Sequence, residues 1–155
     1  MKKLLFLLLV LSSFSTTQAQ KGLEGNWEGK ITFGGLDGQE QYRFELVLEV
    51  KDRSIKGRSY IYISEDSIIY RELSGKIYED NSVSLKEVFL EDPNGEKRVN
   101  SDSVGNYGRK YQFVYERSIW ESTLNGYWQE VIVLPFHARR EMGRIYLEKK
   151  KPGKA

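Results

Sequence analysis

The chemistry open to this chain of 155 residues rests on carboxylates and guanidinium groups, because the sequence contains no Cys and one His, His137. The lack of Cys excludes thiol nucleophiles and thiolate metal sites. A serine triad would need His137 as its base, and that residue sits in a turn-like stretch beside two arginines. No P-loop, dinucleotide fingerprint or metal-ligand spacing occurs. The sequence therefore predicts no catalytic residue, no metal site and no cofactor.

Two arginines and two glutamates are predicted to face the inside of a β-sheet, where charge is costly unless it is paired. One interpretation is structural: ion pairs near the strand ends, or a β-bulge near Lys86 that turns one glutamate outward. The other is a polar floor that orients a ligand, whose apolar part lies against two tryptophans and a tyrosine. The candidate ligand-binding residues are Trp27, Tyr42, Arg71, Glu87, Arg117, Trp128 and Glu130.

The inward acids also allow an enzymatic alternative. Two carboxylates facing one cavity are the minimum for glycoside hydrolysis, and Glu87 and Glu130 would be that pair. The sequence does not give the distance between them, so a glycoside-active enzyme stays an alternative to non-catalytic binding.

A third interpretation concerns the outer surface, where several tyrosines share the outward face of two paired strands. With Tyr62 opposite Tyr70, such a strip could stack on a glycan or cover a protein partner. The structural alternative is cross-strand aromatic pairing that stabilises an edge. The candidate surface residues are Tyr60, Tyr62, Tyr70 and Tyr78.

The elements that must position these residues are β-strands, because apolar and polar residues alternate with a period of two. Short turn-rich segments between them favour antiparallel neighbours over helical crossovers. We therefore predict an all-β, up-and-down meander of about eight strands in a closed or nearly closed barrel, with a two-sheet β-sandwich as the alternative. The predicted strands cover residues 23–33, 42–50, 55–64, 68–78, 82–90, 110–120, 124–134 and 143–149.

The register follows from the turns, because a slip of one residue would exchange the two faces of a strand. The turn before Leu124 is ambiguous. Two turn residues near Ser122 put Arg117 inward, whereas three put Glu116 and Trp120 inward. The predicted cross-strand pairs are Val50 with Ile55, Ile63 with Ile69, Leu73 with Glu87, Ile77 with Val83, and Arg117 with Gly126.

The pattern L-x-G-x-W occurs at 23–27 and at 124–128, and predicts a Gly at a bend or close approach beside a buried Trp. The first copy, Gly25-Asn26-Trp27, resembles the opening strand of the lipocalin and avidin group of calycin-type barrels. The resemblance implies a closed eight-strand barrel with a ligand cavity at one mouth. It also implies a basic residue of the last strand packed across Trp27, for which Arg144 is the nearest candidate. Biotin or retinoid binding is not carried over.

Residues 1–20 have the pattern of a cleaved secretory signal peptide: Lys2 and Lys3, an apolar run over 4–11, and Ala19 before the cleavage site. The run is too short to span a membrane, and no Cys follows it to carry a lipid. We predict a secreted or periplasmic protein that is not a lipoprotein, with one domain over 21–149 and a basic flexible tail over 150–155.

Without Lys2 and Lys3 the chain has 22 basic and 22 acidic residues, so nucleic-acid binding loses its electrostatic support. The sequence thus favours a non-catalytic protein that binds a small apolar or amphipathic ligand.

Overall fold

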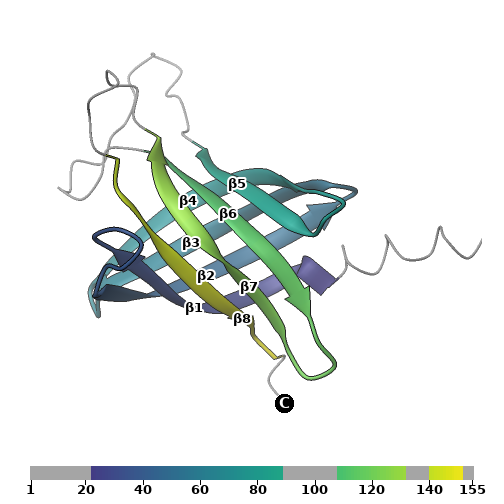
Figure 1. The fold of residues 1–155 in the computed structure, drawn as a ribbon, viewed down its shortest axis with the longest axis horizontal. Coiled ribbons are helices and arrows are strands. Elements are labelled where there is room, and N and C mark those ends of the chain that lie inside the picture. The colour runs from purple at the N-terminus through teal and green to yellow at the C-terminus, as the bar shows by residue number, and fades with distance from the viewer. Residues whose placement is uncertain (1–21, 89–107, 132–139, 152–155) are drawn as a thin grey trace, which may run out of the picture.

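Eight antiparallel strands follow one another around a closed barrel in the computed structural model (Figure 1). The structure describes residues 22–88, 108–131 and 140–151, so the predicted signal peptide and His137 lie outside the described residues. The all-β fold and the closed meander are confirmed, and the sandwich alternative is wrong. The strands are β1 (Gly25–Phe33), β2 (Glu40–Lys51), β3 (Ser54–Ser64), β4 (Ser67–Ile77), β5 (Ser82–Val88), β6 (Gly108–Arg117), β7 (Ser122–Val131) and β8 (Met142–Lys149).

The barrel closes because β1 pairs with β2 on one side and with β8 on the other. Alternation along each strand then sends one face inward, as in β6, where Tyr111 and Phe113 are buried and Lys110 and Val114 are exposed. Burial of this apolar face is the main stabilising contribution. The largest fully buried side chains include Trp27, Phe44, Tyr111, Phe113 and Trp128.

The two ends of the barrel differ in what lies there. At one end are the turns β2–β3, β4–β5 and β6–β7, the helical residues Gly22 and Leu23, and the last residue of β8. Leu23 is fully buried, so we call this the capped end. The other end holds the turns β1–β2 and β3–β4, the start of β8, and the termini of β5, β6 and β7, which carry the buried charges of Glu87, Arg109 and Glu130. We call it the polar end.

Three of the predicted registers are confirmed, namely Val50 with Ile55, Leu73 with Glu87, and Ile77 with Val83. The register between β3 and β4 is wrong by two residues. Ile69 faces Ile61, and Tyr70 faces Tyr60. A β-bulge between Tyr62 and Ser64 precedes the turn. A shift of two keeps every side chain on its face, so alternation alone could not detect it.

The register between β6 and β7 is also wrong. The turn contains four residues, 118–121, so Arg117 faces Ser122 and Gly126 faces Phe113. Neither predicted turn length holds, and Glu116 and Trp120 are both exposed. Gly126 is nevertheless at a close approach, because a Cβ there would lie 1.8 Å from the carbonyl oxygen of Gln112.

Candidate functional site

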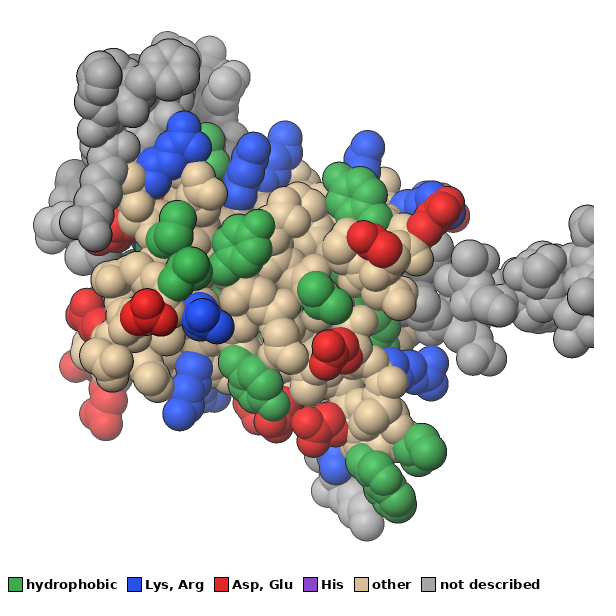
Figure 2. Space-filling view, in the orientation of Figure 1, with side chains coloured by type: hydrophobic (Ala, Val, Ile, Leu, Met, Phe, Trp, Pro, Cys, Tyr) green, Lys and Arg blue, Asp and Glu red, His purple; other side chains and the backbone are tan. Residues whose placement is uncertain are grey.

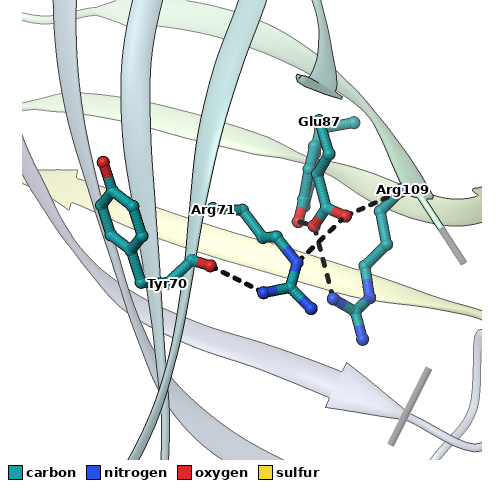
Figure 3. Close-up of polar contacts among 5 residues, drawn as sticks. Tyr70, Arg71, Glu87 and Arg109 are labelled. Atoms are coloured by element: carbon teal, nitrogen blue, oxygen red, sulfur yellow. Dashed lines mark hydrogen bonds and ion pairs between the residues drawn. The ribbon is translucent and has the colours of Figure 1, made fainter. Parts of the chain in front are cut away.

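A buried carboxylate, Glu87 at the end of β5, organises the polar end (Figure 3). It accepts hydrogen bonds from the backbone N–H of Arg109 at 3.1 Å, from Nη1 of Arg109 at 3.3 Å and from the Tyr111 hydroxyl at 2.7 Å. Its side chain has no solvent exposure. The predicted alternative, a bulge near Lys86 that turns Glu87 outward, is wrong, because the ladder continues regularly through Lys86.

Arg71 on β4 reaches the same carboxylate from the other side, as its predicted diagonal position implied. Its Nε lies 3.9 Å from Oε2 of Glu87, and its Nη1 donates to the backbone carbonyl of Tyr70 at 2.8 Å. The Arg71 side chain is 29% exposed. Two guanidinium groups thus flank one carboxylate (Figure 3). Of the two, Arg71 lies farther from the carboxylate and is the one that reaches solvent.

Arg109 is the functional candidate that the sequence analysis missed. It is 2% exposed, and its guanidinium lies over the rings of Phe33 and Trp128, at 5.7 and 5.2 Å from their centroids. Its Nε has no hydrogen-bond partner in the described part of the chain. The alternation of β6 could have revealed it, because Arg109 precedes Tyr111 by two residues. The predicted strand starts at Lys110, two residues after the observed start of β6 at Gly108, and so leaves Arg109 out.

Tyr111 completes the cluster as a hydrogen-bond donor. Burial, together with the negative charge of Glu87, raises the pKa of its hydroxyl well above the usual value of 10. The phenol therefore keeps its proton and donates to the carboxylate throughout the physiological pH range.

Two of the predicted aromatic residues also lie at the polar end. Trp128 is fully buried, and its indole N–H donates to the carbonyl oxygen of Thr32 at 2.8 Å. Tyr42 is half-buried and packs edge-on against Phe33, with 5.5 Å between ring centroids. Its hydroxyl donates to the carboxylate of Glu40, which raises the pKa of Tyr42.

Glu130 faces inward at the end of β7, directly opposite Arg109 in the register. It is buried, and its carboxylate accepts the backbone N–H of Glu141 at 3.1 Å. Both predicted acids are therefore at the polar end, and both oxygens of Glu87 are occupied by donors. Glycoside hydrolysis stays a prediction.

Trp27 and Arg117 do not belong to this cluster, because both lie toward the capped end. The Trp27 indole donates to Leu23 at 2.9 Å, and Lys149 Nζ lies 5.7 Å from the ring centroid. Arg117 is exposed at the end of β6. The expectation that Arg144 covers Trp27 is wrong, because Arg144 is exposed and its Nε donates to the carbonyl oxygen of Leu36.

The four surface tyrosines do not form one strip. Tyr60 and Tyr70 face each other with ring centroids 5.4 Å apart. Tyr62 lies beneath Arg43 and donates to Glu45. Tyr78 follows β4 at the capped end, where it lines a surface depression of about 670 Å³. The other residues lining the depression are Asp52, Arg53, Ser54, Lys76 and Ile77.

Within residues 22–88, 108–131 and 140–151, no group of three or more His, Asp or Glu side chains could hold a metal ion. In the same residues, no helix has the length and apolar character needed to cross a membrane.

No family model matches the sequence, and neither a curated protein nor a solved structure matches it.

Proposed function

We propose that the protein is a secreted, non-catalytic binding protein that holds a small amphipathic ligand at the polar end of the barrel. The position of Arg71 is the observation that carries the proposal. The side chain faces inward, is partly exposed, and lies 3.9 Å from a carboxylate that Arg109 and Tyr111 already hold more closely. A guanidinium in this position can bind an anionic head group without breaking the buried pair.

The apolar part of the ligand would lie against half-buried side chains at the same end. Tyr42, Ile63 and Ile69 are only partly buried and pack against the core. Below them the interior is occupied by stacked rings, with 5.9 Å between the centroids of Phe44 and Tyr111. The ligand would therefore rest on the core rather than penetrate to the capped end.

The resemblance to lipocalin and avidin barrels remains part of the proposal. The closed meander of eight strands supports it, as does the cation of the last strand over Trp27. That cation is Lys149, not the expected Arg144.

The test compares three ligands with the same twelve-carbon chain and different heads: dodecanoate, dodecanol and dodecyltrimethylammonium. Isothermal titration should rank dodecanoate first, because its head complements Arg71. Arg71→Met should weaken dodecanoate binding about fivefold or more, since a hydrogen-bonded charge pair is lost. It should change the free energy of unfolding by less than about 1 kcal/mol, because the side chain is partly exposed.

Arg58→Met is the matched control, because Arg58 is exposed on the outer face of β3. Equal dodecanoate affinity in the wild type and in Arg71→Met would contradict the proposal, as would preference for the cationic ligand. Native mass spectrometry of the protein from its own secretory compartment would then show whether any ligand is carried.

The Tyr60–Tyr70 pair supports a second candidate, binding of a glycan or protein on the outer wall. Tyr70→Ala should abolish such binding, whereas Arg71→Met should preserve it.

A further inference from the structure

The tip of the β6–β7 hairpin presents two large apolar side chains to solvent. Ile119 is 93% exposed and Trp120 is 84% exposed. Of the other large apolar side chains that the structure describes, none exceeds 52%. The hairpin projects beyond the barrel at its capped end (Figure 1), and Figure 2 shows apolar side chains at that extremity. Such exposure is unfavourable in water and points to an apolar surrounding.

The turn holds these side chains in place with its own hydrogen bonds. The backbone N–H of Ser118 donates to the carbonyl of Glu121 at 2.8 Å. The Ser118 hydroxyl accepts the backbone N–H groups of Trp120 and Glu121 at 3.2 and 3.0 Å. The backbone therefore fixes the direction of the tip, and the exposure of Ile119 and Trp120 is a feature of the folded turn.

We propose that this tip inserts into the interfacial region of a lipid membrane. A stable protein interface buries about 800 Å² on each partner, far more than two side chains at a narrow tip can offer. A membrane needs no complementary pocket, and an indole favours the boundary between headgroups and hydrocarbon. The proposal stands independently of ligand binding at the polar end.

The charges around the tip are of both signs. Glu116, Arg117 and Glu121 are exposed next to it, and the register of Thr123 with Glu148 brings the end of β8 alongside. The exposed Lys150 and Lys151 follow that strand, and Lys150 pairs with Glu28 at 3.2 Å. Because these charges nearly balance, insertion of the apolar side chains carries the binding. Membrane binding should therefore occur on zwitterionic vesicles and increase only modestly with anionic lipid.

Docking through this tip would orient the whole molecule. The tip is at the capped end, so the polar end with Arg71 would face away from the membrane, toward water. A ligand could therefore reach the polar end while the protein is bound.

The experiment uses 100 nm vesicles of phosphatidylcholine, alone and with one quarter phosphatidylglycerol. Of the three tryptophans, Trp27 and Trp128 are buried, so changes in emission report Trp120. Emission should shift to the blue with vesicles, and lipids brominated on their chains should quench it. Ile119→Ser with Trp120→Ser should lower vesicle partitioning, measured by flotation, at least about tenfold.

Tyr127→Ser is the control, because Tyr127 is exposed on the wall of β7, away from the tip. It should partition like the wild type. Circular dichroism establishes that the double variant is folded, as expected when both altered side chains are exposed. The proposal is overturned if the wild type does not partition, or if the double variant partitions equally well. It is also overturned if ultracentrifugation shows a dimer that only the double variant loses, because the occupant is then a second copy.

Discussion

Each end of the barrel contains a buried tryptophan beneath a cation, and the two arrangements use different partners. At the capped end, Trp27 donates to a backbone carbonyl and lies under Lys149. At the polar end, Trp128 also donates to a backbone carbonyl and lies under Arg109. The two tryptophans occupy the same place in the repeated L-x-G-x-W pattern.

The two ends differ in the groups that their cations contact. Lys149 donates to the neutral carbonyl of Gly22 at 2.5 Å, and burial lowers its pKa. Arg109 is paired with the buried carboxylate of Glu87, which Arg71 also approaches. The chain itself thus closes the capped end, whereas the polar end brings together two guanidinium groups and two buried carboxylates, Glu87 and Glu130.

This difference shows how one structural device can serve two purposes. A cation over an indole stabilises both ends. Only the polar end adds further charged groups, and of these Arg71 is partly exposed to solvent. The comparison can be tested by removing the groups that distinguish the two ends.

The largest effect should follow from Glu87→Gln. The change leaves Arg109 buried without its counter-charge, which should lower the free energy of unfolding by about 3 kcal/mol. Urea unfolding followed by fluorescence measures it. Glu49→Gln, an exposed acid on β2, is the control and should have almost no effect. Equal stability of the two variants would mean that the charged cluster does not distinguish the ends energetically.

A smaller effect should follow from Tyr111→Phe, which removes a hydrogen bond to a carboxylate and should cost about 2 kcal/mol at neutral pH. The raised pKa of Tyr111 means that the unfolded chain loses this proton first as pH rises through 10. The wild type should therefore lose stability from pH 10 up to the folded-state pKa.

Tyr111→Phe should lose less stability over the same pH range, and the exposed Tyr127→Phe should behave like the wild type. Urea midpoints at pH 8, 10 and 11 measure the difference. If the urea midpoints of the wild type and Tyr111→Phe fell by the same amount as pH rises, the Tyr111 proton would not be linked to folding.

The fold could be predicted because alternation with period two and short turns both point to an antiparallel meander. The β6–β7 turn could not be predicted, because its sequence, SIWE, contains Ile119 and Trp120, which continue the apolar pattern of a strand. The turn depends on the hydroxyl of Ser118, whose hydrogen bonds appear only in the folded backbone. As a result, the sequence predicts that Arg117 faces the interior, as the alternation of β6 implies. Arg117 is in fact the last residue of the strand, and its side chain is exposed.

The candidate site was predicted in part. Alternation and one correct turn brought Arg71 and Glu87 together. Arg109 was missed because it lies next to a long polar segment, where alternation gives little guidance to the start of a strand. Arg144 and Lys149 are both on β8, but they fall on opposite faces. The resemblance points to Arg144 near the start of that strand, whereas Lys149 at its end makes the contact with Trp27.

The smallest effect should follow from Lys149→Met at the capped end. Methionine keeps most of the packing of the lysine stem but loses the contact with Trp27 and the hydrogen bond to Gly22. Burial lowers the pKa of Lys149, so removing the charge also relieves a desolvation cost that opposes these losses. We expect a net destabilisation of about 1 kcal/mol or less. Arg144→Met should have almost no effect in the same urea experiment, because the Arg144 side chain and its hydrogen bond to Leu36 are exposed. A loss from Lys149→Met as large as that from Glu87→Gln would mean that both ends depend equally on charge. The charged cluster at the polar end would then no longer set that end apart.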